Sequence, residues 1–115
     1  MIASLLRPDL DESARYSYIL DRWESMAGGK RIDYDNKVFL SEKNEPYTNR
    51  ALACLMRGKN AFPENTDIEK CLEFYFMCCS LEADTDRLSI VAATLANNGV
   101  NPLTGQRVLQ SETVR

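Results

Sequence analysis

The feature that most constrains this chain is the stretch of residues 62–81, FPENTDIEKCLEFYFMCCSL. Its apolar side chains recur at i, i+3, i+4, i+7, i+8 and i+11, which is the spacing of one face of an α-helix. These residues are Ile68, Cys71, Leu72, Tyr75, Phe76 and Cys79. Phe74, Met77 and Cys78 place further apolar side chains on the other faces, and a helix that is apolar nearly all round is buried nearly all round. We therefore expect a buried central helix, with the Tyr75 hydroxyl as its one inward polar group.

The start of this helix is marked by Pro63 and by the capping-box pattern of Thr66 and Glu69. The length of 115 residues predicts one domain, and 44% hydrophobic and 27% charged residues are typical of a globular protein. We expect a mainly α-helical fold, in a single helical subdomain over residues 1–115. No apolar run reaches the roughly 18 residues that a membrane span requires. The opening MIASLL is too short for a signal peptide.

Three further helices are predicted by the same spacing. They run from Asp9 or Asp11 to about Ala27, from about Tyr47 to Arg57, and from Asp84 or Thr85 to the terminator Asn97-Asn98-Gly99. The side chains expected to point inward are Tyr16, Ile19, Leu20, Trp23, Met26 and Ala27 in the first helix, Ala51, Leu52, Leu55 and Met56 in the second, and Leu88, Val91, Ala92, Leu95 and Ala96 in the third.

The remaining segments are interpreted as loops or partial helices. Residues 30–40 are expected to form an irregular extended loop with two short β-prone pieces, at 32–34 and 38–40, followed by a polar turn at residues 41–46. A turn is expected around Thr104-Gly105. Residues 1–6 resemble the last turns of a helix, and residues 111–115 the first turn of another. We therefore expect the chain to be truncated at both ends.

The cysteines and the missing histidine exclude several classes of site. Cys54, Cys71, Cys78 and Cys79 lie in helical patterns with no C-x-x-C, so we expect four core thiols in a reducing, intracellular compartment and no zinc site. The chain has no histidine, which excludes a Ser-His-Asp or Cys-His arrangement built from this chain alone. Neither a metal nor a cofactor is expected.

The charge balance argues against nucleic acid as a partner, because the net charge is −3 and phosphate binding requires clustered Lys and Arg. One alternative is a helix-turn-helix protein with residues 47–59 as its recognition helix. Arg50, Arg57 and Lys59 give that segment a mild basic tilt, but the acidic net charge and the apolar helix that follows disfavour it.

Two long runs resemble a known family. SEKNEPYTNRALACLMRGKNAFPENTDIEKCLEFYFMCCSLE, followed by AATLANNGVNPLTGQRVL, is similar to the serine-dependent glutaminases, and the likeness covers about residues 9–115. The resemblance implies part of a β-lactamase-like fold, in which a helical subdomain packs against an α/β half. It also implies hydrolysis of L-glutamine to L-glutamate and ammonia, in mitochondria for an animal protein and in the cytoplasm for a bacterial one. Further implied partners are the rest of the glutaminase domain and other copies in a homo-oligomer.

The nucleophile of that family is the serine of an S-x-x-K motif, activated by the lysine. No serine of this chain has a lysine three positions later; the residues there are Arg7, Tyr16, Leu20, Gly28, Asn44, Ala83, Ala92 and Val114. No catalytic residue is therefore assigned. We expect the chain to supply part of the substrate pocket and to be inactive by itself, with a non-catalytic helical interaction module as the alternative.

Three residues match the family's substrate-binding positions. Glu42 resembles the carboxylate that receives the α-ammonium group of the substrate, and Asn49 resembles the asparagine at its carboxylate. Tyr75 resembles the tyrosine whose hydroxyl lies at the reactive end of the pocket. The chain departs from the family pattern at residues 44–47, which replace an acidic and glycine-containing turn, and at Thr48, where a basic residue is common.

Each of the three residues also has an ordinary structural interpretation. Glu42 would be a solvated loop carboxylate, Asn49 a first-turn residue with a local hydrogen bond, and Tyr75 a core aromatic with its hydroxyl at the surface. Only the resemblance raises their functional interpretation above these alternatives.

Overall fold

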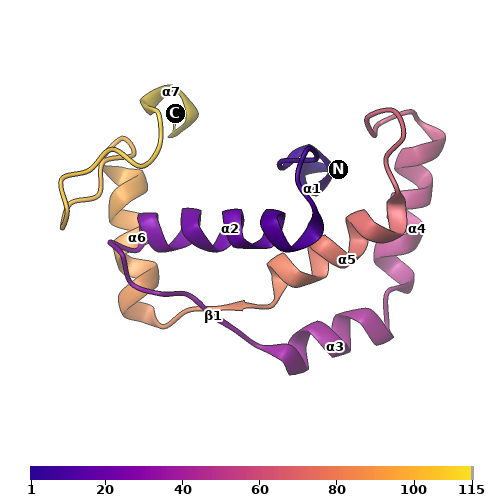
Figure 1. Ribbon diagram of the computed structural model, residues 1–115, viewed down its shortest axis with the longest axis horizontal. Coiled ribbons are helices and arrows are strands. Elements are labelled where there is room, and N and C mark those ends of the chain that lie inside the picture. Colours follow the sequence, from indigo (N-terminus) through magenta and orange to yellow (C-terminus); the bar gives the residue numbers. More distant parts are fainter. Residues whose placement is uncertain (115) are drawn as a thin grey trace. The chain divides into compact units, whose positions relative to one another are not determined.

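The computed structural model describes residues 1–114, and these are mainly helical, as predicted (Figure 1). The elements are α1 Ile2–Leu5, α2 Glu12–Met26, β1 Asp33–Tyr34, α3 Asn36–Asn44, α4 Tyr47–Gly58, α5 Ile68–Cys79, β2 Leu81–Glu82, α6 Thr85–Ala96 and α7 Ser111–Val114. Helix α7 begins at the predicted Ser111, and the last residue of that predicted turn, Arg115, lies outside the described residues.

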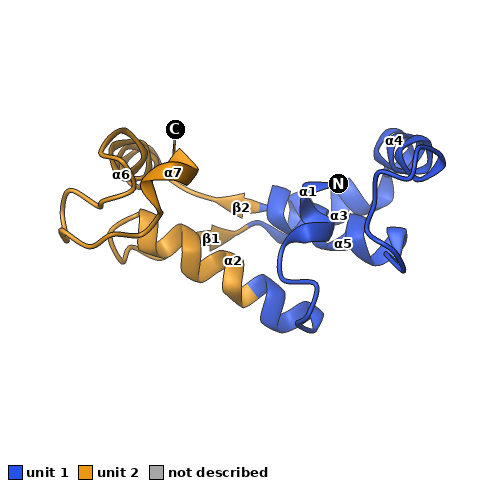
Figure 2. Cartoon of the chain, turned by 90° about the horizontal axis from the view of Figure 1, so that it is seen from above, with its two compact units in different colours: residues 1–16, 35–80 blue, residues 17–34, 81–115 orange. Residues whose placement is uncertain are grey.

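The chain divides into two compact units, coloured separately in Figure 2. Unit 1 comprises residues 1–16 and 35–80, and unit 2 comprises residues 17–34 and the chain from Leu81 onward. The boundary falls inside α2, between β1 and α3, and between α5 and β2. The assignment of residues 1–115 to a single subdomain stays a prediction.

Helix α5 is the central element of unit 1, since it contacts α1, α3 and α4 (Figure 1). Its Leu72 and Phe76 form a buried cluster with Ala53 of α4. Phe74 is fully buried, and the Arg15 guanidinium lies 3.9 Å from the centre of its ring. The predicted central helix is confirmed in this unit.

Two details of the α5 prediction are wrong. The helix is capped by Asp67, whose carboxylate accepts a hydrogen bond from the Lys70 amide at 3.1 Å, while the Thr66 hydroxyl donates to the Pro63 carbonyl at 2.8 Å. No Thr66–Glu69 capping box forms, because both side chains have other partners. Tyr75 is also not an inward residue, since 42% of it is exposed.

The loop predicted at residues 30–46 contains a helix instead. Helix α3 begins after Asp35, whose carboxylate accepts hydrogen bonds from the amides of Lys37 at 2.8 Å and Val38 at 3.2 Å. This N-cap satisfies two amides of the first turn, which lets the β-prone residues 38–40 continue as helix. The helix extends to Asn44 and so includes most of the segment predicted as a polar turn. Only β1 of the extended structure expected here is formed.

Unit 2 is built around the carbonyl of Met26. The Thr94 hydroxyl and the Asn101 amide both donate to this oxygen at 2.9 Å, and the Asn101 amide also reaches the Thr94 hydroxyl oxygen at 3.1 Å. The Asn101 side-chain oxygen accepts from the amides of Leu103 and Thr104. These buried polar groups are therefore satisfied by partners far apart in the sequence.

The apolar and extended parts of unit 2 complete this arrangement. Ala27, Ile32 and Val91 form its buried cluster, and β1 pairs antiparallel with β2. Of the two predicted caps of α6, Asp84 and Thr85, the structure selects Asp84, whose carboxylate accepts a hydrogen bond from the Arg87 amide. The predicted terminator is confirmed, with left-handed backbone at Asn98 and Gly99.

The buried faces of two helices differ from the prediction. In α4 the buried residue is Ala53, while Leu52 and Leu55 are exposed. In α6 Val91 is buried as expected, but the second buried residue is Thr94, and Leu88 and Leu95 are exposed. The apolar periodicity therefore predicted where these helices lie in the sequence but did not predict which of their faces is buried.

Candidate functional site

The three predicted substrate-binding residues all lie in unit 1, on three helices. Glu42 is on α3, Asn49 is in the first turn of α4, and Tyr75 is on α5. Since α5 contacts both α3 and α4, the fold places the three residues on helices that pack together. Glu42 and Asn49 are half-buried and Tyr75 is more exposed.

Asn49 and Tyr75 line the same pocket, which has a volume of about 390 Å³. Most of the other lining residues are apolar and come from the N-terminus, α4, α5 and the loop between these two helices. They include Ile2, Leu52, Met56, Phe62, Ile68 and Leu72. The amide of Asn49 and the hydroxyl of Tyr75 are thus polar groups at a mostly apolar wall, an arrangement typical of small-molecule sites.

Tyr75 is held in its neutral form. A hydrogen bond with Cys79, one helical turn along α5, and the electrostatic effect of that side chain raise the pKa of the Tyr75 hydroxyl above its ordinary value of 10.0. Burial and the negative charge of Glu42 raise the pKa further. At neutral pH the phenol is therefore protonated and can donate a hydrogen bond.

Glu42 is related to Tyr75 through charge and does not line the pocket with Asn49. Its carboxylate is near enough to disfavour the Tyr75 phenolate. The prediction placed Glu42 in a turn, whereas the structure places it on α3, so a helix fixes its backbone. A carboxylate, an amide and a neutral phenol are thereby carried by the same group of packed helices.

These groups match the chemistry of a free amino acid. The ammonium group of an amino acid requires an acidic acceptor, and its carboxylate requires amide or hydroxyl donors. The structure also places Cys79 beside Tyr75, a neighbour that the sequence analysis did not assign to the site. The signal that could have found it is the four-residue spacing, which puts both side chains on one side of a helix.

Four serines make local hydrogen bonds and show no sign of an activated nucleophile. The hydroxyls of Ser4, Ser25, Ser80 and Ser89 donate to backbone carbonyls three or four residues earlier. Such local bonds are the usual role of a helical serine.

Within residues 1–114, no group of three or more cysteine or acidic side chains could hold a metal ion. Over the same part of the chain, no helix combines the length and the apolar character needed to cross a bilayer.

Comparison with known proteins identifies the family of the chain. The family model described as Glutaminase matches residues 1–115. The chain is 37% identical over 115 residues to putative glutaminase 3 of Caenorhabditis elegans, with all of this chain and 20% of that protein covered. It is 35% identical to the mitochondrial liver isoform of rat glutaminase, again over all of this chain and over 19% of that protein.

Solved structures give the same result. A probable glutaminase of Bacillus subtilis superposes with a TM-score of 0.87 at 27% identity, covering 98% of this chain and 35% of that one. The fold is accordingly that of a part of the β-lactamase-like glutaminases. The chain spans about one fifth of the length of the animal relatives that it matches.

Proposed function

Because the chain belongs to the glutaminase family, we propose that it forms one wall of a pocket in which L-glutamine is hydrolysed to L-glutamate and ammonia. The observation that carries this proposal is the grouping of the three matched residues in unit 1. Asn49 and Tyr75 line one pocket, and the charge of Glu42 reaches Tyr75.

Each residue has a role that suits its chemistry. Glu42 accepts the α-ammonium group of the substrate, and the Asn49 amide donates to the substrate carboxylate. The protonated Tyr75 hydroxyl donates at the reactive end, where negative charge develops as the amide bond is attacked. An analogue that lacks one of these partners leaves a buried polar group unpaired, which costs about 1–3 kcal/mol.

The reacting serine comes from outside residues 1–115, since no serine of the chain is followed by lysine at the required spacing. The other half of the pocket comes from the rest of a glutaminase domain, within a homo-oligomer. The free thiols suit a reducing compartment, which is mitochondrial for an animal source and cytoplasmic for a bacterial one.

The test uses the 115-residue chain and a hybrid enzyme. In the hybrid, residues 1–115 replace the matching segment of full-length C. elegans putative glutaminase 3. We expect no ammonia release from glutamine by the chain alone and measurable release by the hybrid. Turnover by the purified chain would show that its nucleophile had been missed.

The substitution Tyr75→Phe tests the role of the hydroxyl. In the hybrid it should lower kcat by about tenfold or more, because a donor to developing charge is lost, with little change in the unfolding temperature. Tyr47→Phe is the matched control, since Tyr47 is 73% exposed on α4. An unchanged kcat in Tyr75→Phe would leave Tyr75 as a packing residue.

The alternative of an interaction module is favoured by the exposed apolar side of α4. Leu55 is 64% exposed, and Tyr47 and Leu52 are exposed as well. On either hypothesis we expect the isolated chain to self-associate, which sedimentation at high protein concentration would detect. The interaction module alone predicts a hybrid that folds and releases no ammonia.

A further inference from the structure

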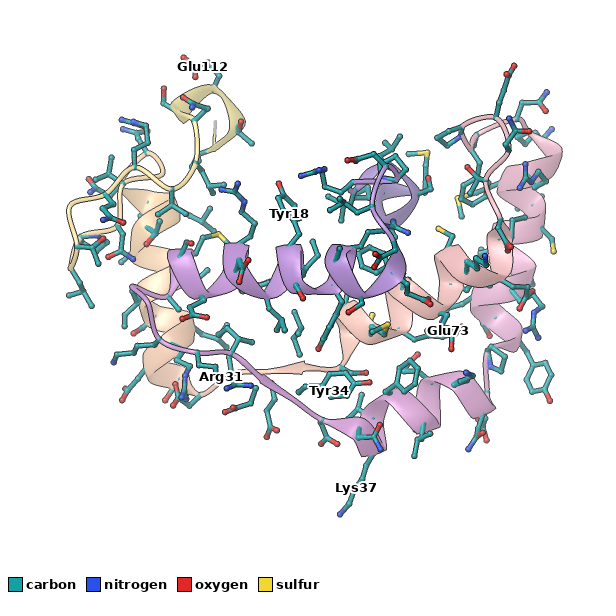
Figure 3. The ribbon with its side chains drawn as sticks, in the orientation of Figure 1. Tyr18, Arg31, Tyr34, Lys37, Glu73 and Glu112 are labelled. Carbon is teal, nitrogen blue, oxygen red and sulfur yellow. The ribbon has the colours of Figure 1, made fainter. Side chains whose placement is uncertain are left out.

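Helix α5 carries two glutamates one turn apart, and each is paired with a cation from a different helix. The Lys43 ammonium on α3 lies 2.5 Å from a carboxylate oxygen of Glu73, which projects from α5 (Figure 3). The Arg50 guanidinium on α4 makes two hydrogen bonds to Glu69, of 2.9 and 2.7 Å. A two-point contact of this kind fixes orientation as well as distance.

Each cation directly follows a proposed substrate-binding residue in the sequence. Lys43 follows Glu42 on α3, and Arg50 follows Asn49 on α4. Because neighbouring residues of one helix move together, a shift of α3 along α5 would move Glu42 relative to Tyr75. A shift of α4 would move Asn49 in the same way.

We propose that the Lys43–Glu73 and Arg50–Glu69 ion pairs are positioning contacts, which set α3 and α4 in register on α5 and thereby set the spacing of Glu42 and Asn49 from Tyr75. The inference rests on the proposed function, because it assumes that these three residues bind the substrate. The four charged residues are positioning residues and touch no substrate.

The apolar contacts that join α3 and α4 to α5 are few, so the ion pairs can determine the positions of these helices. Phe39 is the residue of α3 that packs against the apolar cluster formed with α5, and Ala53 is the buried residue of α4. Apolar packing is not directional, so a few such contacts hold helices together without fixing their register. Charged hydrogen bonds at defined atoms supply that direction.

The pKa shifts of the paired groups are those expected of two formed ion pairs. The hydrogen bond and the charge of Glu73 raise the pKa of Lys43, and Glu69 acts in the same way on the pKa of Arg50. In return, Arg50 lowers the pKa of Glu69 below its ordinary value of 4.5. Both pairs are solvent-exposed, and exposed pairs contribute little to folding. Their loss should therefore be seen in substrate binding before it is seen in stability.

The experiment measures kcat and KM for glutamine in the hybrid enzyme. Lys43→Met keeps the aliphatic stem of Lys43 without its charge, and Arg50→Met does the same for the other pair. We expect each variant to raise KM about fivefold with kcat within about twofold, since the proposed ammonium and carboxylate contacts are displaced. The charge-exchanged double variant K43E/E73K should return KM to within about twofold of the parent.

The matched control is Asp9→Asn, which removes the exposed Arg7–Asp9 pair elsewhere in unit 1. Its KM should equal that of the parent. An unchanged KM in both Lys43→Met and Arg50→Met would overturn the inference. So would equal losses of kcat and unfolding temperature without recovery in K43E/E73K, because that pattern belongs to a purely structural contact.

An inactive parent hybrid would count against the proposed function. It would not show whether the ion pairs set the register of α3 and α4 on α5. The register is then read in the 115-residue chain by NMR, from nuclear Overhauser cross-peaks between the Phe39 and Phe76 rings, which belong to one packed cluster. Weaker cross-peaks in Lys43→Met that recover in K43E/E73K support the positioning role. Cross-peaks that are equal in all three chains exclude it.

Discussion

The two units of this chain hold their helices together by different means. In unit 1, charged and exposed contacts at Lys43–Glu73 and Arg50–Glu69 join α3 and α4 to α5. In unit 2 the corresponding contacts are neutral and buried, and they converge on the Met26 carbonyl. Buried hydrogen bonds are costly to break, whereas exposed ion pairs are cheap to rearrange.

This difference in polar contacts parallels the location of the proposed site, which lies in one unit only. Unit 1 carries all three proposed substrate-binding residues and the pocket that two of them line. Unit 2 carries none of them, and its buried asparagine and threonine have no remaining polar atom to offer a ligand. The comparison suggests that unit 1 is built for binding and unit 2 for rigidity.

Unit 1 nevertheless depends on one large side chain, and its removal should have the largest effect on stability. Phe74 is fully buried beneath the Arg15 guanidinium, so Phe74→Ala removes both ring packing and the cation–π contact. We expect a loss of about 4 kcal/mol in the free energy of unfolding, measured with urea. Tyr47→Ala, at an exposed aromatic of the same unit, should change it by less than about 0.5 kcal/mol. Similar values for the two variants would contradict the packing described for α5.

The buried network of unit 2 should show the next largest effect. Asn101→Ala removes hydrogen bonds to Met26 and Thr94 and leaves the amides of Leu103 and Thr104 without their acceptor. The expected loss is about 3 kcal/mol.

Asn97→Ala is the control for that network, because the Asn97 amide makes one exposed bond to the Val100 carbonyl. Its expected cost is below about 1 kcal/mol. If Asn101→Ala were no more harmful than Asn97→Ala, rigidity in unit 2 would not come from its buried polar groups.

Two glycines extend the comparison, since their substitution by alanine should lower stability in unit 2 and raise it in unit 1. In unit 2, Gly99 has φ +81°, and a Cβ there would lie 2.3 Å from the Leu109 carbonyl oxygen. Gly99→Ala should therefore cost about 2 kcal/mol or more. In unit 1, Gly58 ends α4 with open space around it, so Gly58→Ala should stabilise by about 0.5–1 kcal/mol. Thermal unfolding of both variants checks the signs, and a stabilised Gly99→Ala would remove the steric argument.

The last effect appears only at alkaline pH and belongs to unit 1, which holds all four cysteines. Burial, with a contribution from Cys79, raises the pKa of the Cys78 thiol from 9.0 to about 11. The folded state therefore resists ionisation that the unfolded state accepts. This contribution to stability is complete below pH 9 and is lost as the pH rises towards 11.

Stability curves for the parent and Cys78→Ala between pH 8 and about 11 measure that loss, which should be smaller in the variant. Thiol labelling gives a second readout. The prediction of four core thiols is wrong for Cys54 and Cys79, which are exposed. At pH 8 these two should react with a disulfide reagent well before Cys78. Equal labelling rates for Cys78 and Cys79 would contradict the burial of Cys78.

The sequence predicted the helices better than their faces. Helices α2, α4, α5 and α6 lie where apolar spacing placed them, and Asp84 caps α6 as expected. The missed helix α3 follows an aspartate, and Asp35 before Val38 and Phe39 could have been interpreted as an N-cap. The β-branched and aromatic residues at 38–40 favoured the wrong prediction, because local propensity is weaker than a satisfied cap and a packed Phe39.

The candidate site could be assigned from the sequence only by resemblance. Sequence spacing alone did not predict that Glu42, Asn49 and Tyr75 lie near one another, because they belong to three helices whose packing is a tertiary property. That their positions in unit 1 bind substrate stays a proposal. Lys43 and Glu73 are thirty residues apart in the chain, so no local sequence pattern predicts that they pair.

By itself, then, the sequence indicated the family through its resemblance over long runs. It also determined the helical class and the starts of most helices, because these depend on periodicity and caps within a few residues. Only the tertiary structure decided that Leu52 and Leu55 are exposed, that Tyr75 lies at a pocket, and that Asn101 reaches the Met26 carbonyl across 75 residues. A helix has several apolar sides, and a polar side chain has many possible partners. The neighbours that fold against them determine which side is buried and which hydrogen bond forms.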